Sequence, residues 1–362
     1  MRLRPREANG LAARLLCPVY MEMVATIAFP DRVPLATLPT RIFAPPQRLT
    51  DYLGDRELLI KRDDETGCGT SGNKIRKLEL FAAEALAQGA DTLITGGNRL
   101  SNHARISAIV ARELGLDIHL VLSGNGHVDI DGNILLDKLL GATIHYVPSS
   151  ERWNMGEVMD AIAADLLKQG RKPYIIPAGG SAPLGVMAYM GCAREIKEQL
   201  DAMGKKADAV TVAVGSGSTA AGLMLGARAF GLGCPVYAVH ISRTAGCHFP
   251  LIRGLIEQTR ERFGIETEVP DEDINVITGY VGTAYGEATP PELAFIHDIA
   301  QRTGLLLDPI YTGKAFRGTL EEIRDGVLSH CRRVVFVHTG GIYGLFSFRD
   351  DFGFCENGKP MA

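Results

Sequence analysis

The segment from Ser71 to Glu79 holds the residue best suited to covalent chemistry. It reads Ser-Gly-Asn-Lys-Ile-Arg-Lys-Leu-Glu, so small residues and an amide stand directly before a lysine that opens a helical pattern. A lysine at a helix start lies at the positive end of the helix dipole, which favours the neutral amine that Schiff-base formation needs. Lys74 is therefore the candidate nucleophile. The alternative is that Lys74, Arg76 and Lys77 form the solvated face of a surface helix.

A glycine- and hydroxyl-rich loop in the second half of the chain is suited to binding a phosphate. It lies between an apolar run that predicts a strand and an Ala/Gly-rich run that predicts a helix, and it consists of Gly215, Ser216, Gly217, Ser218 and Thr219. Glycines let the backbone fold around an anion, while hydroxyls and the N–H groups of a helix start donate hydrogen bonds. The alternative is a plain strand-to-helix turn. A lysine for an aldehyde and a loop for a monophosphate are together what pyridoxal phosphate requires.

The block from Gly96 to His103 predicts a site for a carboxylate. It follows an apolar run and opens a helical pattern, so backbone N–H groups at the helix start lack partners and Ser101 adds a hydroxyl donor. A plain helix cap by Ser101 or Asn102 is the alternative interpretation. A single histidine facing a helix is usually structural, so we expect only the backbone amide of His103 to contribute.

Together these blocks resemble the signature of the D-cysteine desulfhydrase and 1-aminocyclopropane-1-carboxylate deaminase family of pyridoxal-phosphate enzymes, which are similar to tryptophan synthase β. The similarity runs from about Phe29 to about Phe346 and includes the run Ile-Lys-Arg-Asp-Asp that begins at Ile60. It implies an α/β fold in two lobes, with parallel-rich sheets flanked by helices and the cofactor between the lobes. It also implies a homodimer that acts on a small amino acid.

The resemblance implies roles for single residues as well. Lys74, and not Lys77, carries the cofactor, and Asn102 contacts its ring hydroxyl. The substrate carboxylate is assigned to Ser101, Asn102 and His103, the substrate-facing tyrosines are Tyr285 and Tyr311, and the residues near the pyridine nitrogen are Thr312 and Thr339. Without the resemblance, a tyrosine in an apolar segment is more often a core residue.

Thr312 favours elimination over ring opening. The deaminase branch of the family has a glutamate at the matching position, which protonates the pyridine nitrogen and strengthens the electron sink. A hydroxyl gives only a neutral hydrogen bond, which is adequate when a good leaving group departs from Cβ. We therefore predict that D-cysteine is converted to pyruvate, ammonia and sulfide, with Lys74 as the general base. 1-Aminocyclopropane-1-carboxylate deaminase is an alternative activity.

Two departures from the family pattern leave the substrate open. Asn98-Arg99-Leu100 and Ile342-Tyr343-Gly344 differ from the usual residues near the implied substrate pocket. Arg99 is suited to a second acidic group such as a sulfonate, which makes cysteate sulfo-lyase an alternative, although a solvent-facing arginine is the other interpretation. A non-enzymatic protein that binds a phosphate ligand on a similar fold is the alternative from another class.

Composition excludes several classes of partner. The net charge of −4 and the lack of a basic tract argue against nucleic acid and anionic membranes. No stretch approaches the roughly 18 apolar residues of a membrane span. The seven cysteines are scattered and lack metal-ligand spacing, so we expect no metal site and reduced thiols in a cytoplasmic protein.

The chain is too long for a single core, and its pattern predicts two sheets. We expect an N-terminal extension at residues 1–24, a large cofactor-binding domain at residues 25–76 plus 183–362, and a small domain at residues 77–182. The arginine-rich start is compatible with a presequence, a flexible extension or a mis-assigned start codon. The predicted strands are Leu58 to Lys61, Thr92 to Thr95, Ile118 to Leu122, Thr143 to Val147, Tyr174 to Pro177, Ala209 to Val214, Val236 to Ile241 and Val334 to His338. Predicted helices include Asn102 to Leu114, Met155 to Leu167 and Leu184 to Leu200.

Overall fold

The computed structural model describes residues 27–45, 49–124, 130–241, 248–283 and 286–354. The predicted N-terminal extension therefore lies outside the described residues. The strands are β1 (Ile42–Phe43), β2 (Glu57–Lys61), β3 (Thr92–Asn98), β4 (Asp117–Ser123), β5 (Thr143–Val147), β6 (Pro173–Ile176), β7 (Ala209–Val214), β8 (Val236–His240), β9 (Asn275–Ile277) and β10 (Arg333–Val337). The helices are α2 (Thr50–Leu53), α3 (Lys74–Ala87), α4 (Asn102–Glu113), α5 (Gly132–Leu139), α6 (Met155–Lys168), α7 (Pro183–Ala202), α8 (Ser218–Ala229), α9 (His248–Phe263), α10 (Pro290–Thr303), α11 (Thr312–Asp325) and α12 (Ile342–Leu345).

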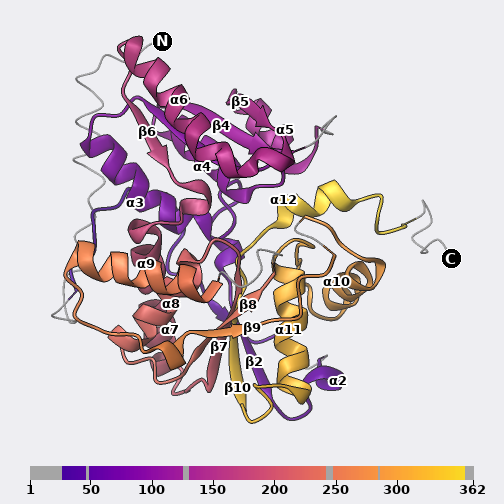
Figure 1. Cartoon of the computed structure of the whole chain (residues 1–362). Helices are drawn as coiled ribbons and strands as arrows, with labels where there is room; N and C mark the ends of the chain where they lie inside the picture. Colours follow the sequence, from indigo (N-terminus) through magenta and orange to yellow (C-terminus); the bar gives the residue numbers. More distant parts are fainter. Residues whose placement is uncertain (1–26, 46–48, 125–129, 242–247, 284–285, 355–362) are drawn as a thin grey trace.

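Within the described residues the strands form two sheets, which confirms the prediction from the sequence. A six-stranded sheet has the order β1-β2-β10-β7-β8-β9, and a four-stranded sheet has the order β5-β4-β3-β6. Neighbouring strands pair in parallel except for the antiparallel pair β1 and β2. Because β3 to β6 form the smaller sheet, the chain leaves the larger sheet after β2 and returns to it with β7 (Figure 1).

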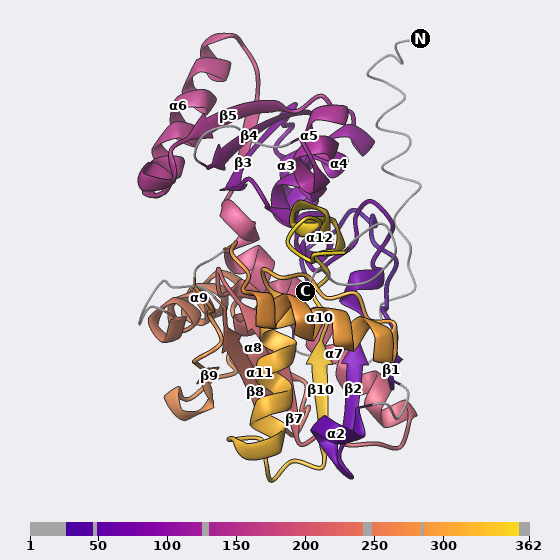
Figure 2. The same ribbon diagram turned by 90° about the vertical axis from the view of Figure 1, so that its right-hand side faces the viewer.

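Helices cover both faces of the larger sheet, and this explains its sequence pattern. The strand β7 reads Ala-Val-Thr-Val-Ala-Val and is buried at every position, as expected for a central parallel strand. The helices α10 and α11 lie on one face and α7 and α8 on the other (Figure 2). Every strand and helix predicted from the sequence is present, with ends that shift by a few residues. The strands β1 and β9 are too short, at 2 and 3 residues, to leave a pattern.

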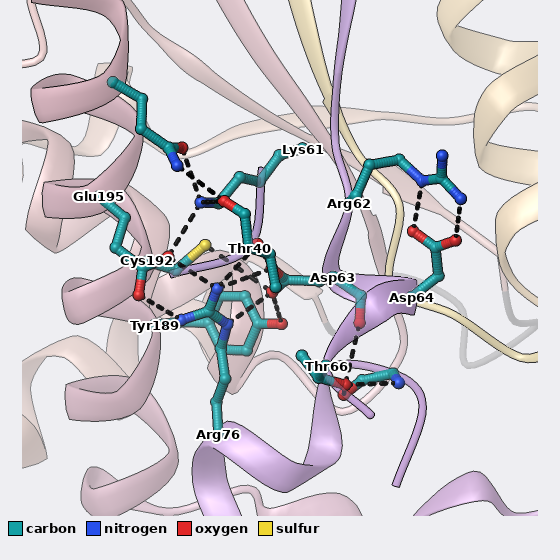
Figure 3. A network of polar contacts seen from close by, with 12 residues as sticks. Thr40, Lys61, Arg62, Asp63, Asp64, Thr66, Arg76, Tyr189, Cys192 and Glu195 are labelled. Carbon is teal, nitrogen blue, oxygen red and sulfur yellow. Dashed lines mark hydrogen bonds and ion pairs between the residues drawn. The ribbon is translucent and has the colours of Figure 1, made fainter. Parts of the chain in front are cut away.

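A buried cluster of charged side chains anchors α3 to the larger sheet and to α7. We call it the Asp63 cluster, and its charged members are Lys61, Asp63, Arg76 and Glu195 (Figure 3). Asp63 Oδ1 accepts from Arg76 Nη2 at 2.8 Å, and Lys61 Nζ donates to Glu195 Oε2 at 2.9 Å. Two positive charges face two negative charges, which offsets the cost of removing them from water. The cluster therefore fixes the first turn of α3, where Lys74 lies.

Candidate active site

Lys74 is the first residue of α3, as its sequence context predicts. It is half-buried, and its Nζ donates to the carbonyl oxygen of Gly179 at 3.2 Å. Burial lowers the pKa of Lys74 from its ordinary value to about 8, although a hydrogen bond with Lys77 opposes the shift. The direction agrees with the sequence argument, but the main cause is desolvation.

Lys77 lies one turn further along α3 and is buried more deeply. Its side chain is fully buried, and its Nζ donates to Ser218 Oγ at 2.8 Å. Burial and the neighbouring charge of Lys74 lower the pKa of Lys77 well below its ordinary value. Arg76 is also buried, at 4% exposure, so the interpretation of this segment as a solvated face is wrong.

We expect the Lys74 amine to react with small aldehydes at a lower pH than lysines of ordinary pKa. The neutral amine is the reactive form, and its fraction rises as the pH rises through a pKa of about 8 instead of 10.5. Reductive alkylation of cofactor-free protein across this pH range, followed by peptide mass spectrometry, measures the effect. Labelling of Lys74 that rises only near the pKa of an ordinary lysine would contradict the prediction.

The predicted phosphate loop lies at the start of α8, beside Lys74. Gly217 caps the helix with φ of +91°, a conformation that side-chain-bearing residues rarely adopt. A Cβ atom added at Gly179 would lie 2.8 Å from Ser216 Oγ and 3.6 Å from Lys74 Nζ. The missing side chain at Gly179 thus lets the phosphate loop approach the segment that accepts the Lys74 hydrogen bond. The helix start supplies backbone N–H donors at the same place.

The hydroxyls of this loop are not equally available. Ser218 Oγ accepts from Lys77 and donates to the carbonyl oxygen of Gly180 at 3.1 Å, so its hydroxyl is fully used inside the protein. Thr219 Oγ1 accepts from Asn73 Nδ2 at 3.1 Å and keeps its own proton. The loop contains three hydroxyl side chains, and the structure leaves those of Ser216 and Thr219 as donors for a ligand.

The backbone around Gly72 joins the lysine loop to the end of β10. Asn73 donates its backbone N–H to the carbonyl oxygen of Thr339 at 3.0 Å. A Cβ at Gly340 would lie 2.6 Å from Gly72 Cα, so glycine is required where these two segments touch. Gly72 therefore permits close approach of the protein's own backbone. Thr339 is half-buried beside this contact.

The predicted carboxylate block forms the start of α4. Ser101 is the N-cap, and its Oγ accepts from the backbone N–H of Ala104 at 3.1 Å, which matches the plain capping interpretation. Its hydroxyl proton remains available to a ligand. Asn102 is 8% exposed, and its Oδ1 accepts from Asn133 Nδ2 at 3.1 Å.

The His103 side chain is structural, as the sequence argument expects. Its Nε2 lies 2.9 Å from Thr95 Oγ1, and that hydroxyl donates to the carbonyl oxygen of Ile176 at 2.8 Å. The hydroxyl proton is thus used, so His103 Nε2 must donate and Nδ1 carries the lone pair. Burial, with the charges of Lys74 and Lys77, lowers the pKa of His103 well below its ordinary value and keeps the ring neutral.

Thr312 begins α11 and is fully buried. Its Oγ1 donates to Asp308 Oδ1 at 2.7 Å and accepts from the backbone N–H of Asp308 at 2.8 Å. The hydroxyl that the sequence argument placed against a pyridine nitrogen is therefore already used. Tyr311 precedes it, and a Cβ at Gly215 would lie 3.6 Å from Tyr311 Cε1, which puts the ring beside the phosphate loop. Tyr285 lies outside the described residues.

Asp308 organises this part of the site, although sequence reasoning gave it no role. Its carboxylate accepts the backbone N–H groups of Ile310, Tyr311 and Thr312 at 2.8 to 3.0 Å. Burial raises the pKa of Asp308 above its ordinary value, and these hydrogen bonds oppose the shift. The sequence signal that could have predicted this cap is an acidic residue shortly before a helix start.

The two departures from the family pattern lie near the start of α4. Arg99 is half-buried, and its guanidinium has no hydrogen-bond or ion-pair partner in the part of the chain that the structure describes. Tyr343 lies in α12, where its hydroxyl donates to the carbonyl oxygen of Cys68 at 3.1 Å. Its ring packs against the guanidinium of buried Arg105 at 4.3 Å.

None of the helices in the described residues has the length and apolar character that crossing a membrane requires. Among the same residues, no three His, Cys, Asp or Glu side chains come together as a potential metal site.

Comparison with known proteins gives a consistent result. The family model for pyridoxal-phosphate dependent enzymes matches residues 35–340. A bifunctional D-cysteine desulfhydrase/1-aminocyclopropane-1-carboxylate deaminase, mitochondrial, of Arabidopsis thaliana is 39% identical over 322 residues, which cover 86% of this chain and 78% of that protein. A D-cysteine desulfhydrase of Klebsiella pneumoniae is 37% identical over 306 residues, covering 83% and 91%. The crystal structure of a 1-aminocyclopropane-1-carboxylate deaminase homologue has a TM-score of 0.82 at 35% identity and covers 97% of this chain and 99% of its own. The predicted fold class is confirmed.

Proposed function

This chain belongs to the family of pyridoxal-phosphate dependent enzymes, and on that premise we propose that it catalyses α,β-elimination on a β-substituted amino acid, D-cysteine first. The observation that carries the proposal is the half-buried Lys74 amine beside the glycine-rich start of α8. Named relatives act as lyases or deaminases, so the non-enzymatic alternative loses its support. Water completes the reaction, in which D-cysteine gives pyruvate, ammonia and hydrogen sulfide.

The residues present fit pyridoxal phosphate. A Cβ at Gly179 would lie close to both Ser216 Oγ and Lys74 Nζ, so the loop that suits a phosphate and the amine that suits an aldehyde are near each other. Ser216, Thr219 and the backbone N–H groups at the start of α8 would hold the phosphate. Lys74 would hold the aldehyde carbon. When bound, the cofactor supplies an electron sink next to the substrate's amino carbon.

The chain's own groups then have separate tasks. Ser101 and the backbone amides at the start of α4 bind the substrate carboxylate. The Lys74 amine, with its pKa lowered to about 8, accepts the Cα proton at Nζ. The leaving thiolate departs from Cβ with the electron pair of the C–S bond and takes up a proton. Tyr311, beside Gly215, closes one side of this space.

Thr312 supports elimination over cyclopropane ring opening. It stands where the deaminase branch has an acid, and its hydroxyl is held by Asp308. The carboxylate of Asp308 in turn accepts hydrogen bonds from three backbone N–H groups. These bonds hold the carboxylate against the start of α11. An arrangement without a strong acid at the ring nitrogen suits substrates that bring a good leaving group.

We expect D-cysteine and β-chloro-D-alanine to release pyruvate, and 1-aminocyclopropane-1-carboxylate to react at least about tenfold more slowly in kcat/KM. The reason is that only the first two substrates carry a leaving group on Cβ. Pyruvate assays with both cysteine enantiomers and with cysteate measure elimination. A separate assay for 2-oxobutanoate measures ring opening of the cyclopropane acid. Ring opening as fast as elimination would overturn the assignment of Thr312.

Cysteate is the second candidate substrate, because Arg99 has no partner for its guanidinium among the described residues. A sulfonate offers three oxygens to such a group. Under this alternative Arg99→Ala reduces cysteate turnover far more than D-cysteine turnover. Equal losses for both substrates would exclude it.

The assembly and location belong to the same proposal. We infer a homodimer in the cytoplasm, with the cofactor between a large domain at residues 25–76 plus 183–362 and a small domain at residues 77–182. The free thiols of Cys68, Cys192, Cys234 and Cys331 support a reducing compartment. A monomer in light scattering at assay concentration would contradict the first part.

A further inference from the structure

Asn133, in the first turn of α5, is buried against the start of α4. It is 2% exposed, and its Nδ2 donates to two acceptors. These are the carbonyl oxygen of Leu100 at 2.9 Å and Asn102 Oδ1 at 3.1 Å. Asn133 thus contacts both the turn before α4 and the side chain that the resemblance assigns to the cofactor ring.

These two contacts determine which way both amides face. A backbone carbonyl can only accept a hydrogen bond, so the Asn133 group next to Leu100 O must be the NH2 group. That NH2 group also reaches Asn102, whose facing atom must then be the acceptor Oδ1. The Nδ2 of Asn102 therefore points away from Asn133. No hydrogen bond within the described residues uses Asn102 Nδ2. Because this nitrogen is also not fully buried, its N–H groups are accessible to a ligand.

The position of Asn133 is fixed from the other side by α12. The preceding residue, Gly132, has φ of +50°, and a Cβ there would lie 2.4 Å from the carbonyl oxygen of Tyr343. Asp131 caps α5 by accepting the N–H of Gly132 at 2.7 Å. Arg105 packs against Tyr343 and donates to the carbonyl oxygen of Ser71 in the lysine loop at 2.9 Å. The departure at residues 342–344 is therefore part of the support of Asn133 (Figure 2 shows α12 beside α5).

We propose that Asn133 is a positioning residue that holds Asn102 as a hydrogen-bond donor, selecting an anionic oxygen as its ligand. This inference rests on the proposed function, because the ligand is the ring oxygen of bound pyridoxal phosphate. A donated hydrogen bond stabilises the oxygen as an anion. Without Asn133, the Asn102 amide is free to turn and present Oδ1, which repels an anion.

The test compares Asn133→Ala and Asn133→Asp with wild type and with Asn102→Ala. The readouts are the affinity for pyridoxal phosphate, from fluorescence titration of cofactor-free protein, and the pKa of the bound cofactor, from its visible absorbance. We expect Asn133→Ala to weaken binding by about three- to tenfold and to shift the spectroscopic pKa in the same direction as Asn102→Ala. Asn133→Asp should act more strongly, because its new carboxylate accepts from Asn102 Nδ2 and reverses the amide. The double variant Asn102→Ala with Asn133→Ala should behave like Asn102→Ala alone.

Asp137→Asn is the matched control. Asp137 lies one turn further along α5 and is 1% exposed, and its carboxylate oxygens form no hydrogen bond to the described residues, Asn102 and Leu100 included. Its replacement should leave the spectroscopic pKa unchanged. If Asn133→Asp does not fold, Asn133→Ser keeps one donor and should give an intermediate shift. Asn133 variants that match Asp137→Asn, or effects that add to those of Asn102→Ala, would overturn the inference. A wild-type protein that binds no pyridoxal phosphate would instead overturn the proposed function.

Discussion

Replacing Lys74 by alanine is expected to lower elimination activity by about 10³-fold or more, because the same amine holds the cofactor and accepts the Cα proton. The variant should also lose the visible absorbance of a covalently held cofactor. Lys74 donates to Gly179 O and is half-buried, so its loss removes few packing contacts. Pyruvate release and absorbance, measured on folded protein, check both effects.

Lys77→Met is the control for this prediction. Lys77 lies on the same helix and also approaches Gly179 O, at 3.4 Å, but its amine is held by Ser218. Borohydride reduction followed by peptide mapping should therefore place the cofactor on Lys74 in both wild type and Lys77→Met. A cofactor adduct on residue 77 in the wild type would refute the assignment.

The sequence predicts the elements and the site components well because each has a local signal. Parallel strands such as β7 are continuous apolar runs, and the helix starts at Lys74, Asn102 and Ser218 follow small or capping residues. Long buried strands and helix starts depend on neighbouring residues alone. The starts of α3 and α8 come together because β2 and β7 belong to the same sheet, and loops after its parallel strands lie at one edge, whereas α4 follows β3 of the smaller sheet.

The sequence does not predict which polar groups are used within the protein. Ser218 and Thr312 have the same local pattern as available hydroxyls, but Lys77 engages Ser218 from 141 positions away, and Asp308 engages Thr312 from four residues before it. The sequence also indicates the wrong main cause for the low pKa of Lys74. It points to the helix dipole, whereas the main cause is burial, which depends on tertiary packing. Asn133 was missed for the same reason, since its partner Asn102 lies 31 positions away.

The other large effect is expected at the Asp63 cluster, where Asp63→Asn should lower the free energy of unfolding by about 3–5 kcal/mol. Asp63 is fully buried and accepts from Thr40, Tyr189 and two nitrogens of Arg76 at 2.7 to 2.8 Å. Removing its charge leaves two buried cations facing Glu195 alone. Denaturant unfolding measures the loss.

Asp64→Asn is the matched control, because Asp64 is the adjacent carboxylate and pairs with Arg62 near the surface at 2.6 Å. Its loss should be about 1 kcal/mol or less.

The wild type should also lose stability in acid. Burial alone would raise the pKa of Asp63. The charges and hydrogen bonds of Arg76, with Lys61 and Tyr189, lower it by more than burial raises it, so that the pKa falls from 3.8 to about 2. The contribution of this ionisation, about 2 kcal/mol, is therefore complete above a pH of about 4 and disappears as the pH falls toward 2. An acid-unfolding profile that is the same for Asp63→Asn and wild type would show that the cluster does not stabilise α3 in this way.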